Sequence, residues 1–147
     1  MKKKRLIIAA VVLWSILVLL CSGLLFHMIS YDRVERIELK TYSHGDGYDY
    51  AELDQYDTWR FITHYNLSSH IYDISACEYG TTFWVTIWLD DGTAIQIAQY
   101  NGARMRISLS EGEMHWIDNL LLFHLIRNLI DEYGLVRGEP APCGADG

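Results

Sequence analysis

Three apolar segments joined by two glycine-containing turns constrain the fold of this chain most strongly. The stretch FWVTIWLDDGTAIQIAQYNGARMRISL, residues 83–109, alternates apolar and polar positions and is interrupted at Asp90-Asp91-Gly92 and at Tyr100-Asn101-Gly102. Alternation with a period of two is the pattern of a strand that buries one face, and short breaks with glycine are typical of hairpins. The sequence therefore predicts a three-stranded antiparallel meander over residues 81–109.

The register of this meander follows from placing its apolar residues on one face. A three-residue loop at the first turn, with glycine in the left-handed region, sets Ile87 opposite Ile95. The same kind of loop at the second turn sets Ile97 opposite Met105. The resulting apolar face consists of Phe83, Val85, Ile87, Leu89, Ile95, Ile97, Met105, Ile107 and Leu109.

The opposite face of the meander carries our first candidate binding residues, Trp84, Trp88, Arg104 and Arg106. In the expected register Trp84 lies opposite Ala98 and Trp88 opposite Ala94. Tryptophan and arginine are enriched at binding hot spots, and an arginine one strand away is within cation–π reach of an indole. A half-solvated face that tryptophan and arginine stems simply cover would look the same in the sequence.

The remaining chain predicts an α+β fold with a small antiparallel sheet of four strands. Residues 34–42 alternate and predict an N-terminal strand beside the meander. Asp54 can cap a short amphipathic helix over residues 55–65. Residues 68–78 are ambiguous, with a short strand possible around 71–74.

A long C-terminal helix is expected to complete the packing. Ser110-Glu111-Gly112-Glu113 matches a capping box, and Gly134 is a suitable terminator, so the pattern predicts one helix from there to about Tyr133. Its apolar residues share one face up to Leu121 but lie on nearly the opposite face from Leu125 onward. We expect internal packing on both sides of this helix; a break at residues 122–124 is the alternative.

The N-terminal residues resemble a membrane anchor. Four cations at positions 2–5 precede an uninterrupted apolar run, residues 6–29, which as a helix would be about 36 Å long, more than the ~30 Å of a hydrocarbon core. This predicts an uncleaved transmembrane signal anchor at 6–29 in a single-pass protein of the cell membrane. The basic tip, residues 1–5, would be cytoplasmic, and residues 30–133 would form an extracytoplasmic domain followed by a flexible tail, 134–147.

Charge restricts the partners of this domain. The chain has 12 Lys+Arg and 19 Asp+Glu, and without the four N-terminal cations 8 remain against 19. A domain with a net charge of about −11 repels nucleic acid, so we exclude DNA and RNA as partners.

A second candidate surface is the acidic and aromatic stretch 44–56, represented by His44, Asp46, Tyr48, Asp49 and Tyr50. Carboxylates and a histidine could gather around a divalent cation, but the EF-hand spacing is absent and we predict neither a metal site nor a cofactor. Cys77 and Cys143 could form a disulfide; a free buried thiol or an intermolecular bond are the alternatives.

Residues 1–133 resemble small single-pass membrane-tethered extracytoplasmic proteins of Gram-positive bacteria. The likeness consists of the basic tip, the apolar run, the strand RVERIELKTY, a short helix, the meander with its DG and NG turns, and a final helix. It implies an extracytoplasmic α+β domain and no particular chemistry.

The catalytic motifs of common enzyme classes are missing from the sequence. It contains no Walker loop, GxGxxG, HExxH or GxSxG. We therefore expect a non-catalytic binding or accessory domain that contacts a membrane or envelope protein, or a ligand, through its sheet face. A homo-oligomeric structural protein assembled through residues 125–133 is the alternative, and a metal-dependent envelope enzyme is a more distant one.

Overall fold

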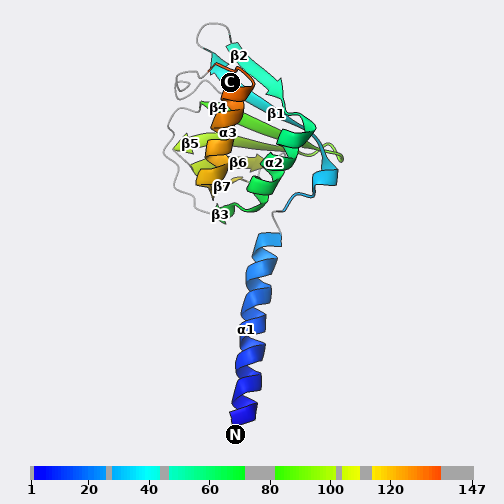
Figure 1. The fold of residues 1–147 in the computed structure, drawn as a ribbon, viewed down its shortest axis with the longest axis vertical. Coiled ribbons are helices and arrows are strands. Elements are labelled where there is room, and N and C mark those ends of the chain that lie inside the picture. The colour runs from blue at the N-terminus through cyan, green and yellow to red at the C-terminus, as the bar shows by residue number, and fades with distance from the viewer. Residues whose placement is uncertain are drawn as a thin grey trace.

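The computed structural model describes residues 2–25, 28–43, 47–71, 82–101, 104–109 and 114–136. Helix α1 stands apart from a folded domain in which helices α2 and α3 lie against a sheet (Figure 1). The elements are α1 (Lys2–Leu25), a 3-10 turn (Tyr31–Arg33), β1 (Val34–Ser43), β2 (Gly47–Glu52), α2 (Gln55–Asn66), β3 (Ser69–Ile71), β4 (Phe83–Leu89), β5 (Ala94–Asn101), β6 (Arg104–Leu109), β7 (Met114–Asp118) and α3 (Leu120–Glu132).

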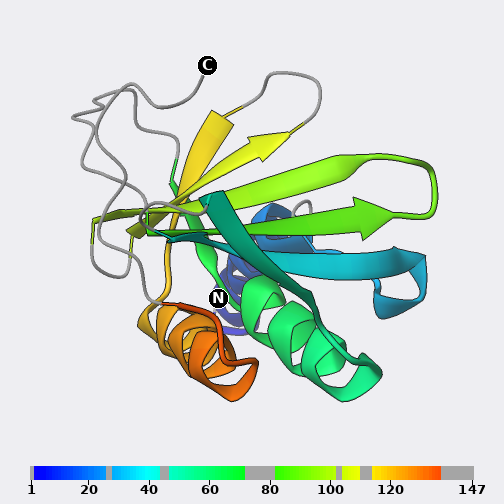
Figure 2. The same cartoon turned by 90° about the horizontal axis from the view of Figure 1, so that it is seen from above.

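The seven strands form one antiparallel sheet in the order β2-β1-β4-β5-β6-β7-β3. Both α2 and α3 lie on the same side of this sheet (Figure 2). The apolar core fills the space between the sheet and the two helices, because alternate residues of each strand point toward the helices. The fully buried members include Ile37, Leu39, Phe61, Phe83, Ile87, Ile97, Met105, Ile107, Ile117, Leu122, Ile126 and Leu129.

The first turn of the meander confirms the expected register. Ile87 pairs with Ile95 and Trp84 with Ala98, and Gly92 has a φ of +81°, the left-handed conformation that a three-residue loop requires. The second turn contradicts it, since Ile97 lies opposite Ile107 and not opposite Met105. The observed pairing thus differs from the expected one by two residues, which leaves the same side chains on the core face, and a one-residue irregularity lies between Gln99 and Asn101.

The expected long C-terminal helix is wrong. Residues 114–118 form strand β7, which pairs with β6 on one side and with β3 on the other. Its burial alternates, with His115 and Ile117 buried and their neighbours more exposed. The two apolar faces that we assigned to one helix therefore belong to two elements, a strand followed by a helix. Residues 110–113, the expected capping box, lie outside the described residues.

Helix α3 instead starts at Leu120 and is capped by Asn119. The Asn119 side chain accepts a hydrogen bond from the Leu122 N–H at 3.0 Å, and its amide donates to the His64 carbonyl and to the Ser68 hydroxyl. The helix ends as expected at Gly134, which has a φ of +66°. The Leu135 N–H then bonds to the Ile130 carbonyl at 2.9 Å, the long-range bond of a Schellman motif.

The four-stranded sheet that we expected is also too small. Strand β2 lies within the acidic and aromatic stretch 44–56, where we expected no strand, and it pairs with β1 from Glu38–Glu52 to Ser43–Gly47. Strand β3 is short and lies at the other edge. The expected strand at 34–42 and the helix capped by Asp54 are confirmed, since the Asp54 side chain accepts from the Asp57 N–H at 2.8 Å.

The expected transmembrane signal anchor at residues 6–29 is contradicted. In the described part of the chain, no helix is both long enough and apolar enough to cross a membrane. Ile29, the expected outer end of the anchor, belongs to the core of the domain. The single-pass topology and the cell-membrane location that we derived from the anchor are therefore wrong as well.

Asn66 at the end of α2 holds the segment that precedes β1. Its side-chain oxygen accepts from the Ile29 N–H and its amide donates to the Ile29 carbonyl, both at 2.8 Å. Ile29 lies outside regular secondary structure, so no neighbouring strand pairs with its N–H and its carbonyl. The Asn66 side chain forms both of these hydrogen bonds instead.

Replacing Asn66 by aspartate keeps the acceptor and removes the donor. The Ile29 carbonyl would then face a carboxylate, and we expect the free energy of unfolding to fall by about 1–3 kcal/mol in urea denaturation. Asn128→Asp, an exposed position on α3, is the matched control and should change stability by less than about 0.5 kcal/mol. Equal losses in the two variants would contradict the role of Asn66.

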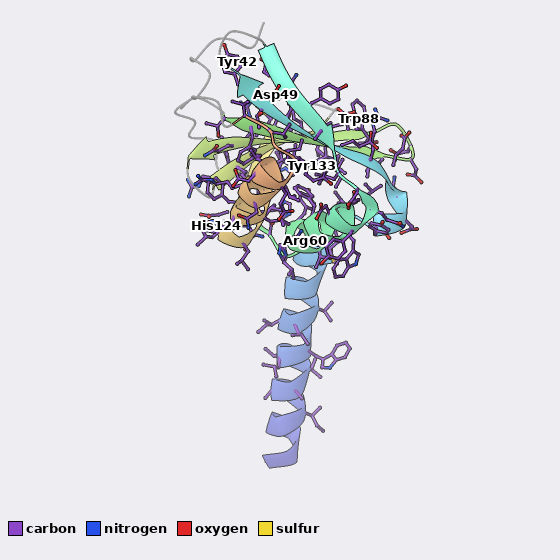
Figure 3. The ribbon with its side chains drawn as sticks, turned by 45° about the horizontal axis from the view of Figure 1, so that its top comes forward. Tyr42, Asp49, Arg60, Trp88, His124 and Tyr133 are labelled. Carbon is purple, nitrogen blue, oxygen red and sulfur yellow. The ribbon has the colours of Figure 1, made fainter. Side chains whose placement is uncertain are left out.

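Tyr133 joins the end of α3 to the start of α2. Its hydroxyl accepts from the Asp54 N–H at 2.9 Å and donates to an Asp57 carboxylate oxygen at 3.1 Å, while the other oxygen of Asp57 accepts from Arg60 at 2.7 Å. Burial, together with this donation to Asp57, raises the pKa of Tyr133 above its usual value. Figure 3 shows Tyr133 and Arg60 extending from the two helices.

The raised pKa of Tyr133 gives an expected pH dependence. The unfolded chain loses this proton first, so the stabilisation is complete below about pH 10 and declines as the pH rises through the pKa of the folded state. Tyr133→Phe should lower the free energy of unfolding by about 1–2 kcal/mol near neutral pH and should weaken its decline between about pH 9 and 11. Urea midpoints of both proteins across this range measure the effect, and parallel pH curves would refute it.

Candidate functional site

The face of the sheet opposite α2 and α3 holds the residues that we selected from the sequence. Neither helix lies on this side (Figure 2). We call it the open face and define it by the strand residues that alternate with the core. Its charged and aromatic members are Arg36, Glu38, Lys40, Tyr42, Tyr48, Tyr50, Glu52, Trp84, Trp88, Arg104, Arg106, Trp116 and Asp118.

One cross-strand row runs through the middle of the open face. Lys40 pairs with Trp84, Trp84 with Ala98, Ala98 with Arg106 and Arg106 with Trp116. Directly opposite residues in an antiparallel sheet have Cβ atoms about 4.5–5.5 Å apart. Two indoles therefore flank a methyl group and a guanidinium group along five neighbouring strands.

Trp84 is mainly a packing residue of this face. It is 8% exposed, clusters with Ala98 and Tyr42, and meets the Tyr48 ring edge-on at 5.5 Å between centroids. The Lys40 ammonium lies 3.9 Å from the centroid of the Tyr48 ring, a cation–π distance. The buried indole thus positions Tyr48 and its cation.

Trp88 forms its cation–π contact with Arg36, and not with Arg104 or Arg106, the arginines that we selected from the sequence. Its direct neighbour Arg36, on β1, places its guanidinium carbon 4.9 Å from the ring centroid. The same guanidinium donates to Glu38 at 2.9 Å, and this hydrogen bond is the main cause that lowers the pKa of Glu38. Arg36 is therefore already engaged by an indole and a carboxylate.

The two arginines of β6 differ in their surroundings. Arg104 lies 3.9 Å from Asp118, with both side chains half exposed, so this ion pair contributes little to stability. Arg106 is half-buried between Ala98 and Trp116, and no carboxylate of the described residues forms an ion pair with it. Arg106 is therefore the cation of the open face most available to a partner.

The open face differs in charge from the rest of the chain. Its described residues include four cations, Arg36, Lys40, Arg104 and Arg106, and three carboxylates, Glu38, Glu52 and Asp118. The chain beyond residue 5 has 8 cations and 19 acidic residues. Half of these cations thus project from one sheet face.

The second candidate surface merges in part with the first. Tyr48, Asp49 and Tyr50 belong to strand β2, and the two tyrosines lie on the open face beside Tyr42 and Lys40. Asp49 lies on the other side, where its carboxylate accepts from the Val136 N–H at 3.3 Å. His44 and Asp46 lie outside the described residues.

Sequence reasoning missed four members of the open face: Arg36, Lys40, Tyr42 and Trp116. The first three lie on the N-terminal strand, whose alternation was recognised but whose polar side was not joined to the candidate surface. Trp116 was assigned to a helix, and the alternation of Met114, Trp116 and Asp118 with His115 and Ile117 was the signal that could have placed it.

Other predicted sites have these outcomes. Among the described residues, no group of three or more His, Cys, Asp or Glu is placed to hold a metal ion. Cys77 and Cys143 lie outside the described residues. The segment proposed for self-assembly directs its large apolar side chains, Leu125, Ile126, Leu129 and Ile130, into the core of its own domain.

Comparison with known proteins finds no matching family model, no similar curated protein and no similar solved structure. The function must therefore be argued from the open face and its chemistry.

The burial of the two tryptophans predicts different costs of removing them. Trp84→Ala should lower the free energy of unfolding by about 3–5 kcal/mol, because it empties a buried site, whereas Trp88→Ala should cost less since Trp88 is only partly buried. Thermal or urea denaturation of the two variants measures the difference. Equal losses would show that Trp84 does not hold the open face together.

Proposed function

We propose that this domain is a non-catalytic binding module whose open face receives an acidic segment of a partner protein. The single observation that carries the proposal is Arg106, a half-buried guanidinium between Trp116 and Ala98 with no carboxylate partner among the described residues. A guanidinium binds a carboxylate bidentately, and the adjacent indole of Trp116 helps to exclude water from that contact.

Charge complementarity supports an acidic occupant. The described residues of the open face include four cations and three carboxylates, whereas the chain beyond residue 5 has 8 cations and 19 acidic residues, so long-range charge favours the approach of an acidic segment to this face over the rest of the domain. This arrangement orients the approach of the partner and gives specificity more than raw affinity.

The aromatic members of the open face can contact apolar side chains of the partner. Tyr50 is 77% exposed and pairs with Lys40 at the β2 end of the row that contains Arg106, and Tyr48, 43% exposed, lies beside this row on the same strand. Tyrosine supplies a large contact area at a small cost in conformational entropy. The expected partner segment therefore contains carboxylates and at least one apolar side chain.

Selection of displayed random peptides on the full-length chain tests this function. Selected peptides should be enriched in Asp and Glu with interspersed apolar residues. Arg106→Gln should weaken their binding by about tenfold or more, which corresponds to the loss of one charge-assisted pair. Binding should also weaken as salt is raised.

Arg33→Gln is the matched control, because it removes the same charge from an arginine that pairs with Asp90 and Asp91 at a turn. It should leave peptide binding within about twofold of the parent. Equal losses for Arg33→Gln and Arg106→Gln, or selected peptides without acidic enrichment, would refute the open face as an acidic-peptide site.

A further inference from the structure

A cavity of about 250 Å³ lies on the helix side of the sheet, away from the open face. Its floor is formed by Thr41, Phe83 and Gln99 and its roof by Phe123, Arg127 and Ile130, with Thr82 at the side. This volume is slightly below the ~300–1,000 Å³ of pockets for drug-sized ligands, so the occupant is a smaller molecule.

The fold builds this cavity from two regular patterns. Thr41 pairs with Phe83 across β1 and β4, and the Trp84–Ala98 pair places Phe83 beside Gln99 on β5, so the floor is one cross-strand row. The roof residues are spaced i, i+4 and i+7 on α3, which puts them on one face of the helix. Rigid elements therefore hold six of the seven side chains.

The polar groups of the cavity are mainly donors. The Arg127 guanidinium carbon lies 5.7 Å from the centroid of the Phe123 ring, and no carboxylate among the described residues pairs with it. The Gln99 carbonyl oxygen accepts from the Thr82 hydroxyl, which directs the amide N–H groups of Gln99 to other acceptors. The described residues that line the cavity include no acidic side chain.

Thr41 adds a further polar group to the floor. Its hydroxyl is buried and has no hydrogen-bond partner among the described residues. A buried polar group without a partner is unfavourable. An acceptor that enters the cavity would offer this hydroxyl a partner, directly or through a water molecule.

The remaining lining is apolar. Phe83 and Phe123 lie 6.2 Å apart between ring centroids at an angle of 38°, and Ile130 completes the wall. All three side chains are at most 8% exposed, whereas Arg127 is exposed at the mouth. The cavity thus combines an apolar interior with one cation and neutral donors.

We propose that this cavity binds a small monocarboxylate with a compact aromatic or branched apolar body. The carboxylate pairs with Arg127 and accepts from Gln99, and the body packs against Phe83, Phe123 and Ile130. Two other kinds of occupant fit less well. An inorganic anion would not cover the apolar wall, and a neutral apolar molecule would leave the hydrogen-bond donors of the cavity without an acceptor. The site does not depend on the open face, which lies across the sheet.

Titration of the full-length chain with benzoate, followed by amide NMR shifts and by the melting temperature, tests the site. Benzamide has the same shape without the charge, and acetate has the charge without the apolar body. We expect saturable binding of benzoate in the low millimolar range or tighter, with shifts in α3 around Arg127 and near Phe83. Benzamide and acetate should each bind about tenfold more weakly or worse.

Two variants locate the carboxylate. Arg127→Gln, at an exposed position that tolerates substitution, should weaken benzoate about tenfold and leave the weak binding of benzamide unchanged. Arg106→Gln on the open face is the matched control and should leave benzoate binding unchanged.

The proposal is overturned by any of three outcomes. The first is the absence of a saturable shift with benzoate at about 20 mM, a concentration well above the Kd expected for a specific site of this kind. The second is equal binding of benzamide and benzoate, which would remove the role of Arg127. The third is a loss of benzoate binding in Arg106→Gln as large as that in Arg127→Gln, which would place the anion on the open face.

Discussion

Alternation of side chains along seven antiparallel strands is the constraint on which the rest of this structure depends. Each strand sends one set of residues to the core under α2 and α3 and the other set to the open face, so a single register determines both surfaces. A shift of one residue at Trp84 would exchange the indole for Phe83 or Val85 and would bury a polar row. The burial of the core therefore determines which residues lie on the open face, and no contact with a partner is needed for this.

The helices are fixed to this sheet by a few polar groups. Asn119 caps α3 and also bonds to the His64 carbonyl at the end of α2, while Tyr133 at the other end of α3 bonds to Asp54 and Asp57 at the start of α2. These bonds set the position of α3 over the floor of the cavity, and Arg127 is placed at its mouth as a result. The two proposed binding surfaces thus lie on opposite sides of one sheet and share its strands.

Local patterns predicted those parts of the fold whose signal lies within a few residues. The β4–β5 register, the Asp54 cap and the Gly134 terminus depend on one turn, one side chain and one backbone angle, and the structure confirms all three. The second turn was misread because moving a pairing by two residues leaves every side chain on the same face, so burial does not distinguish Ile97–Met105 from Ile97–Ile107. The anchor was inferred from the length and apolar content of one segment and from the cations before it, and none of these features reports that Ile29 belongs to the core.

What the sequence by itself determined is the alternating meander and the placement of Trp84, Trp88, Arg104 and Arg106 on its outer side, because side-chain direction along a strand has a period of two whatever else the chain does. Only the tertiary structure decided which strands flank the meander. Pairing β1 with β4 brings Arg36 over Trp88, pairing β2 with β1 brings Tyr48 against Trp84, and pairing β7 with β6 places Trp116 beside Arg106. These contacts join residues distant in the chain, and the burial of a shared core, which no local pattern encodes, selects them.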